Sequence, residues 1–187
     1  MELSDEEKRI LLEAARESII GYFKGEGLPP QADYENHPVL KEHAGAFVTL
    51  TKDKALRGCI GYIIADDPLF LTVCDAARKA AFTDPRFDAL GQNELDKVEL
   101  EISVLSPPFK MKSYDEIVLG KHGVILEDLG RRALLLPQVP IEHRMNKDEY
   151  LSALCEKAGL PSNLWQKRNL NMMLFTASVF SEEEMGG

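Results

Sequence analysis

Cysteine is scarce in this chain, and the scarcity excludes two kinds of scaffold. The three cysteines, Cys59, Cys74 and Cys155, are odd in number and widely spaced. A disulfide framework needs pairs of cysteines and a zinc knuckle needs closely spaced paired ligands, so we expect three free thiols. The histidines likewise form no i, i+4 helical pair and no His-x-His group. Since a glycine-rich phosphate loop is also missing, the sequence predicts neither a metal site nor a cofactor.

Long hydrophobic runs are absent as well. No apolar run approaches the roughly 18 residues of a membrane span. The opening residues Met1–Glu7 are acidic, where a secretory signal would be basic and then apolar. We therefore expect no membrane association and a cytoplasmic location.

The chain also lacks an excess of positive charge, since its formal net charge is -9. A purely electrostatic grip on nucleic acid needs a concentrated basic face, so this charge argues against nucleic acid as a partner. The dipeptides Arg131–Arg132 and Lys167–Arg168 are typical of solvated surface, with a local basic patch as the alternative.

Helical and strand periodicities both occur along the chain. Capping patterns followed by apolar residues at helical spacing predict helices over about residues 4–22, 67–80 and 146–158. Apolar or alternating runs predict strands over about residues 45–51, 57–64, 98–104, 124–127, 133–136 and 174–180. Hairpins recur without strict βαβ order, which predicts an α+β fold: a two-layer, mostly antiparallel sheet packed with helices. The acidic tail over residues 182–184 is expected to be mobile.

The clearest strand covers residues 98–104, where apolar and polar side chains alternate. Side chains of a strand point to opposite faces in turn, so the apolar residues face the core and the polar ones face outward. Glu101 and Ser103 therefore share the outward face. They either line a polar cleft or belong to an ordinary solvated sheet surface.

The most informative run is Ala55–Tyr62, which places a thiol and a guanidinium two residues apart between glycines. On a regular strand Arg57 and Cys59 share one face, and a neighbouring cation lowers the pKa of a thiol. The flanking glycines, Gly58 and Gly61, permit close approach of backbone or ligand. The alternative is a core strand in which Cys59 packs as a small hydrophobe and Arg57 caps the sheet edge.

Five short motifs lie in order along the chain. They are Leu56-Arg57-Gly58-Cys59-Ile60-Gly61, Asp84-Pro85-Arg86-Phe87, Ile102-Ser103-Val104-Leu105, Gly120-Lys121-His122-Gly123 and Leu136-Pro137-Gln138-Val139. Their order and spacing, from about residue 38 to residue 180, resemble the AMMECR-one family. The resemblance implies a single AMMECR domain over residues 1–187, a compact α+β fold of two lobes with a cleft between them. We expect the second lobe within residues 108–165.

The resemblance also implies companions. Microbial members of the family are often encoded beside a Memo-like protein and a radical-SAM protein, in the AmmeMemoRadiSam gene cluster. The family is intracellular and has no settled biochemical activity, so the resemblance assigns a domain and not a reaction.

Two functions from different classes follow. The preferred one is a binding or accessory domain that holds a small anion, a nucleotide or a partner segment. Its candidate ligand-binding residues are Arg57, Gly58, Gly61, Asp84, Arg86 and Ser103. Asp84 and Arg86 either bind an anion or pair with each other.

The second function is a thiol-dependent enzyme acting on RNA, a nucleotide or a modified small molecule. Cys59 would be its nucleophile, activated by Arg57, with His122 or Glu101 as the proton carrier if the fold brings them within about 3 Å. At His122 the family pattern also admits Asp, and both residue types can cap a turn.

Overall fold

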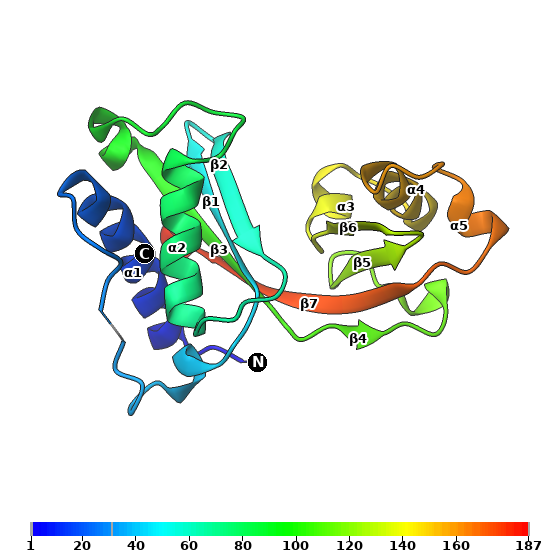
Figure 1. Ribbon diagram of the computed structural model, residues 1–187, viewed down its shortest axis with the longest axis horizontal. Helices are drawn as coiled ribbons and strands as arrows, with labels where there is room; N and C mark the ends of the chain where they lie inside the picture. Colours follow the sequence, from blue (N-terminus) through cyan, green and yellow to red (C-terminus); the bar gives the residue numbers. More distant parts are fainter. Residues whose placement is uncertain (1, 31, 187) are drawn as a thin grey trace. The chain divides into compact units, whose positions relative to one another are not determined.

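The computed structural model describes residues 2–30 and 32–186 and combines helices with antiparallel strands, which confirms the α+β class (Figure 1). The chain divides into two compact units, one formed by Met1–Leu105 with Ser178–Gly187 and the other by Ser106–Ala177. Strand β7 (Met172–Ser181) runs from the second unit into the first. Each unit has its own hydrophobic core.

The first unit packs helices against one face of an antiparallel sheet (Figure 1). Its strands follow the order β2 (Ala55–Tyr62), β1 (Ala46–Lys52), β3 (Val98–Leu105) and then β7. Its long helices are α1 (Asp5–Phe23) and α2 (Leu69–Phe82). Short helices are η1 (Pro38–Lys41), η2 (Gln92–Lys97) and α6 (Glu182–Met185). Strand β2 is therefore an edge strand.

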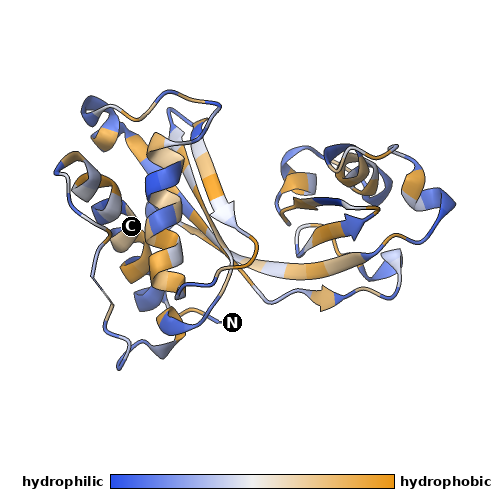
Figure 2. Cartoon of the chain, in the orientation of Figure 1, coloured by the Kyte–Doolittle hydropathy of each residue, from blue (hydrophilic) through white to orange (hydrophobic). Residues whose placement is uncertain are grey.

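Local signals set the limits of these elements. Helix α1 begins at the predicted capping box, in which the Ser4 hydroxyl accepts from the Glu7 amide at 3.3 Å and the Glu7 carboxylate accepts from the Ser4 amide at 2.8 Å. In β3 all four apolar residues predicted to face inward are buried in the core beneath the helices. Figure 2 shows hydrophobic and hydrophilic residues alternating along α2, as an amphipathic helix requires.

Helix α2 begins one residue later than the sequence predicts. Its N-cap is Pro68, in an extended conformation, and no side chain caps the helix. Asp67, the first residue of the predicted helix and a residue type that commonly caps helices, therefore does not cap α2. The first amide of the helix, from Leu69, instead donates to the carbonyl of Glu42 at 2.8 Å, so a distant backbone group satisfies it.

The acidic tail is tied to the first unit and is not free, contrary to the expectation of a mobile tail. It forms α6, and the Glu182 carboxylate accepts from Arg16 at 2.5 Å and from the Leu100 amide at 2.9 Å. Charge-assisted hydrogen bonds from a guanidinium and a strand amide hold Glu182 against the first unit. The acidic composition of the tail alone predicts that this side chain is solvated.

The second unit covers a smaller antiparallel sheet with one helix. Its elements are β4 (Phe109–Lys110), η3 (Tyr114–Glu116), β5 (His122–Asp128), β6 (Arg131–Leu135), α3 (Val139–Glu142), α4 (Lys147–Lys157) and α5 (Leu164–Lys167). Strand β5 pairs with β6 and β7, and β4 pairs with β7. The β5–β6 hairpin turns at Leu129 and Gly130, both at positive φ, between the strands predicted over residues 124–127 and 133–136. Among the described helices, none combines the length and apolar character of a membrane span.

Candidate functional site

The candidate site begins with an irregularity in β2. Strand β2 pairs with β1 so that Cys59 lies opposite Thr49, but the register shifts between Leu50 and Thr51. On the β2 side the shift leaves Arg57 as an extra residue without a partner on β1. This is a β-bulge, and a bulge breaks the strict alternation of side chains between the two faces.

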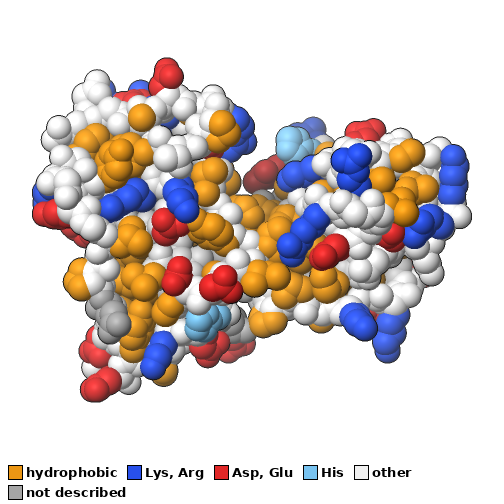
Figure 3. All heavy atoms as spheres, viewed as in Figure 1, with side chains coloured by type: hydrophobic (Ala, Val, Ile, Leu, Met, Phe, Trp, Pro, Cys, Tyr) orange, Lys and Arg blue, Asp and Glu red, His pale blue; other side chains and the backbone are white. Residues whose placement is uncertain are grey.

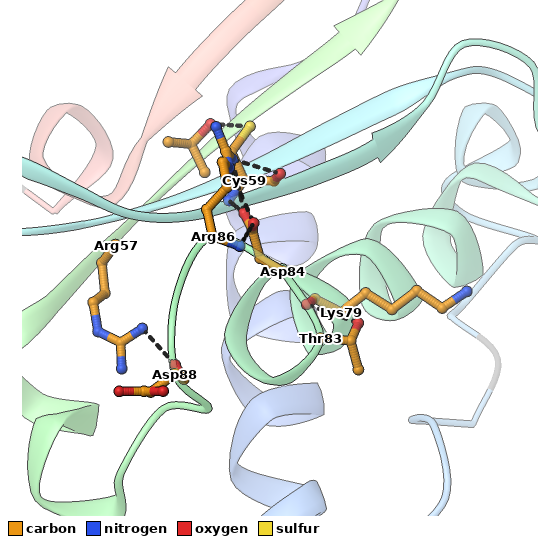
Figure 4. Close-up of polar contacts among 8 residues, drawn as sticks. Arg57, Cys59, Lys79, Thr83, Asp84, Arg86 and Asp88 are labelled. Carbon is orange, nitrogen blue, oxygen red and sulfur yellow. Dashed lines mark hydrogen bonds and ion pairs between the residues drawn. The ribbon is translucent and has the colours of Figure 1, made fainter.

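Because of the bulge, Arg57 and Cys59 point to different faces of the sheet. Lys52 follows Leu50 on the helix-covered face of β1, and both Lys52 and Arg57 bind the Glu94 carboxylate. Arg57 therefore lies on the helix side, whereas Cys59 lies with Thr49 on the other face. Figure 4 shows the Arg57 side chain leading away from Cys59 toward Asp88. The prediction that Arg57 and Cys59 share one surface is wrong.

Arg57 is committed to a local ion pair. Its Nε and Nη2 donate to the Glu94 carboxylate at 3.2 and 2.9 Å, and its Nη1 donates to the Asp88 carbonyl at 2.9 Å. Hydrogen bonds from Arg57 first, and then from Lys52, hold the pKa of Glu94 well below its usual range. Glu94 therefore stays ionised, and the guanidinium serves to join β2 to η2 rather than to activate the thiol.

Cys59 is the one partly exposed thiol, because Cys74 and Cys155 are buried. Its Sγ accepts a hydrogen bond from the Thr49 hydroxyl at 3.3 Å. A threonine hydroxyl is not a base at neutral pH, so this contact orients the sulfur without withdrawing its proton. By contrast, burial raises the pKa of Cys74 to about 12, which keeps that thiol protonated.

Asp84 and Arg86 cap the open edge of β2 at Cys59 (Figure 4). The Asp84 carboxylate accepts from the Cys59 amide at 2.9 Å, and the Arg86 guanidinium donates to the Cys59 carbonyl at 3.3 Å. Arg86 also donates to Asp84 from Nε at 3.0 Å and from Nη2 at 2.7 Å, which lowers the pKa of that carboxyl. The pair therefore takes the place of a neighbouring strand, protecting an edge that would otherwise invite pairing.

The two glycines of the motif serve close approach of backbone. A Cβ on Gly58 would lie 2.2 Å from the Ala80 carbonyl oxygen, so α2 packs directly on the strand there. A Cβ on Gly61 would lie 2.4 Å from the Ala46 carbonyl oxygen and from the Phe47 ring. Both glycines are thus required by packing within the first unit.

The remaining predicted residues are spread over both units. Glu101 lies opposite Thr49 on β3, in the same cross-sheet row as Cys59. Two strand spacings separate the Cα atoms of Glu101 and Cys59, about 10 Å. Ser103 shares the outward face with Glu101, as predicted, and is 2% exposed.

His122 starts β5 in the second unit. Its Nδ1 accepts from the Val118 amide at 3.1 Å, so the ring closes the turn before β5. This geometry matches the turn-capping alternative. Within residues 2–30 and 32–186, no three His, Cys, Asp or Glu side chains gather closely enough to hold a metal ion.

Sequence reasoning missed three residues that organise this site, namely Thr49, Glu94 and Asp88. For Glu94 a signal existed, because its carboxylate accepts from the Gly91 amide in a capping arrangement that begins η2. For Thr49 the regular hairpin register predicts Gly58 as the partner, and only the bulge shifts the pairing to Cys59.

Comparison with known proteins agrees with the motifs. The AMMECR1 family model, the family introduced above as AMMECR-one, matches residues 12–180. A Methanopyrus kandleri protein is 39% identical over 198 residues, covering 99% of this chain and 93% of the relative. A Methanosarcina barkeri protein is 38% identical over 192 residues, covering 99% of this chain and 95% of the relative.

A solved structure shows the same fold. The crystal structure of an uncharacterized protein from Pyrococcus horikoshii superposes with a TM-score of 0.85 at 37% identity, covering 95% of this chain and 92% of that one. The match of fold, motifs and full-length relatives leads to one conclusion. This chain belongs to the AMMECR1 family.

Proposed function

We propose that this protein is a cytoplasmic accessory domain that binds a partner protein through the sheet face around Cys59, and that it is not a thiol-dependent enzyme. The partners proposed are the Memo-like and radical-SAM proteins that the family resemblance implies. The supporting observation is that each cation of the motif segment is already paired. Arg57 binds Glu94 and Arg86 binds Asp84, so a carboxylate already balances the charge of each guanidinium.

The neighbourhood of the thiol supports recognition more than catalysis. Cys59, Thr49 and Phe47 are half-buried on one face of the sheet. A nucleophilic thiol needs an adjacent base or a cation that stabilises the thiolate. The hydrogen bond to Cys59 Sγ comes from a neutral hydroxyl, and Arg86, a cation that interacts electrostatically with this thiol, is already paired with Asp84. This partly apolar face, which also carries Glu101 in the same cross-sheet row, suits contact with a protein segment better than with a nucleotide or phosphate.

One observation favours the enzyme alternative. Cys59 is more exposed than the other two cysteines, and reactive cysteines sit in partly exposed environments. The alternative assigns Cys59 as nucleophile, with Glu101 or His122 as proton carrier and a nucleotide, RNA or a modified small molecule as substrate.

Two measurements separate these functions. The first is the rate of Cys59 alkylation by iodoacetamide as a function of pH, with Cys59→Ser as the blank. We expect Cys59 to react no faster than free glutathione near neutral pH. A rate at least about tenfold above that of glutathione under the same conditions would show an activated thiolate and contradict the proposal.

The second measurement is the affinity for the proposed partners, a Memo-like and a radical-SAM protein, by calorimetry. Cys59→Ser preserves the shape of the contact face and should keep the affinity within about twofold, whereas Cys59→Met adds bulk there and should weaken binding at least about tenfold. Asp96→Asn, an exposed change in η2, is the control. Absence of binding to both proteins, or equal affinity for the Met and Ser variants, would overturn the proposal.

A further inference from the structure

A cavity of about 420 Å³ lies in the first unit beyond the end of β2. Its wall is built by the last residue of β2, the loop over residues 64–67 and residues 71–79 of α2, together with Leu28 from the segment after α1. None of the residues placed around Cys59 above lines it. The cavity is therefore a separate feature, and its proposed role goes beyond partner binding at the Cys59 face.

One end of the cavity holds an ammonium group between two acceptors. The Lys79 Nζ donates to the Tyr62 hydroxyl oxygen at 2.6 Å and pairs with the Asp75 carboxylate at 3.0 Å, so these two oxygens form a cradle for it. The Tyr62 hydroxyl in turn donates to Asp75. A carboxylate and a phenol oxygen both accept hydrogen bonds from an organic ammonium ion, and the bond to the carboxylate is charge-assisted.

The ammonium in the cradle comes from a half-exposed side chain. The Lys79 side chain is 47% exposed, and its hydrogen bonds to Tyr62 and Asp75 raise its pKa, whereas the Asp75 side chain is 33% exposed and also accepts from the Tyr62 hydroxyl. Lysine carries its charge on a flexible four-carbon stem that extends readily into water. An ammonium from another molecule can therefore take the place of the Lys79 ammonium without any change in the backbone.

The rest of the wall supplies negative charge and apolar surface. Its charged side chains are three aspartates, Asp66, Asp67 and Asp75, against Lys79 alone. Leu28 and Ile64 are 39% and 64% exposed, so the apolar part of the wall is open to an occupant. Figure 3 shows acidic, basic and hydrophobic side chains interspersed over α2. Charge and apolar surface together define the ligand as a cation with an apolar body.

Burial raises the pKa of the Tyr62 hydroxyl, and the hydrogen bond to Asp75 adds to this effect. The phenol is therefore neutral at neutral pH and keeps donating to Asp75. Asp75 in turn stays oriented toward the cavity when Lys79 withdraws.

We propose that this cavity binds a small organic amine with an apolar body, whose ammonium group displaces that of Lys79 from the cradle of Asp75 and Tyr62. Leu28 and Ile64 contact the apolar body, and Asp66 and Asp67 draw the cation toward the opening.

The test uses isoamylamine as the probe and isoamyl alcohol, of similar shape but uncharged, as its control. Both are titrated into the full chain while amide shifts are followed by NMR. We expect saturable shifts around Tyr62 and Asp75 with the amine and none with the alcohol. Lys79→Met removes the competing ammonium and should tighten amine binding about fivefold, while Asp75→Asn should weaken it by at least as much.

A matched variant distinguishes the cavity from general attraction to an acidic protein. Asp96→Asn removes an exposed carboxylate of the same unit that does not line the cavity, and it should leave the affinity within about twofold. An effect of Asp96→Asn equal to that of Asp75→Asn would overturn the proposal. So would equal binding of amine and alcohol, or no saturable shift with Lys79→Met at millimolar amine. These outcomes do not involve Cys59 or a partner protein, so they leave the proposed function to its own tests.

Discussion

Replacing Asp84 with asparagine tests whether the Asp84–Arg86 pair is a structural cap of the sheet edge. The Asp84 side chain is 2% exposed and its carboxylate accepts four hydrogen bonds, from the Cys59 amide and from the amide, Nε and Nη2 of Arg86. In asparagine an amino group replaces one carboxylate oxygen. The Cys59 amide and Arg86 Nη2, which both donate to that oxygen in the wild type, then face a donor instead of an acceptor. Two charge-assisted bonds are therefore lost and a buried donor is left unpaired.

The expected loss of stability follows from these contacts. A hydrogen bond to a charged group contributes about 1.5–3 kcal/mol. The Arg86 side chain is 54% exposed, so hydrogen bonds to water replace part of the hydrogen bonding that the guanidinium loses. We expect Asp84→Asn to lower the free energy of unfolding by about 2–4 kcal/mol, a large part of the total of about 5–15 kcal/mol of a folded domain.

The assay is urea denaturation followed by circular dichroism at neutral pH. Asp88→Asn is the matched control, because Arg57 uses the Asp88 backbone carbonyl and not its carboxylate. That variant should stay within about 0.5 kcal/mol of the wild type. A cost below about 1 kcal/mol for Asp84→Asn, with the fold intact, would refute the reasoning.

The stability difference between wild type and Asp84→Asn should depend on pH and should be larger at neutral pH than at acidic pH. Because Arg86 lowers the pKa of folded Asp84, ionisation of this carboxyl stabilises the fold above its unfolded pKa of about 3.9. That contribution is lost as the pH falls toward the folded pKa. The difference in free energy of unfolding between wild type and Asp84→Asn should therefore be full at neutral pH and narrow below about pH 4. A difference that stays constant from neutral pH to below about pH 4 would contradict the conclusion that ionised Asp84 stabilises the fold.

Two further predictions concern the packing of the first unit. Gly58→Ala should destabilise the protein by at least about 2 kcal/mol in the same urea assay, because its Cβ would meet the Ala80 carbonyl oxygen. Gly27→Ala, whose Cβ would meet nothing within 4 Å, is the control, and equal costs for the two would contradict the packing argument. Cys74 should resist iodoacetamide in the native protein, because it is buried and its pKa is raised. Mass spectrometry should find the native label on Cys59, and rapid labelling of Cys74 would show that the helix interface opens.

Much of the fold was predictable because its signals are local. The Ser4–Glu7 capping box, the alternation along residues 98–104 and the turn at Gly130 each depend on residues within a few positions of one another. The structure has a helix start, a half-buried strand and a hairpin at these places. Spacing along the chain carries this information, since helices and strands have fixed periods.

The candidate site was predicted less well, because its geometry depends on contacts between distant segments. The segment containing Cys59 was identified, but its relation to Arg57 was wrong. One extra residue in β2 turns Arg57 to the face where Glu94 lies, 37 positions further along the chain. No periodicity in the sequence marks that extra residue.

Sequence alone determined the family, the α+β class and the order of most of the helices and strands, because these follow from motifs and from hydrophobic periods along the chain. Tertiary structure decided which charges are paired, that Asp84 and Arg86 cap the strand edge at Cys59, and that Tyr62, Asp75 and Lys79 meet at a cavity. The physical reason is that a hydrogen bond or ion pair requires atoms within about 3–4 Å. The register of β1 with β2 and the packing of α2 on the sheet, not spacing in the sequence, bring those atoms together.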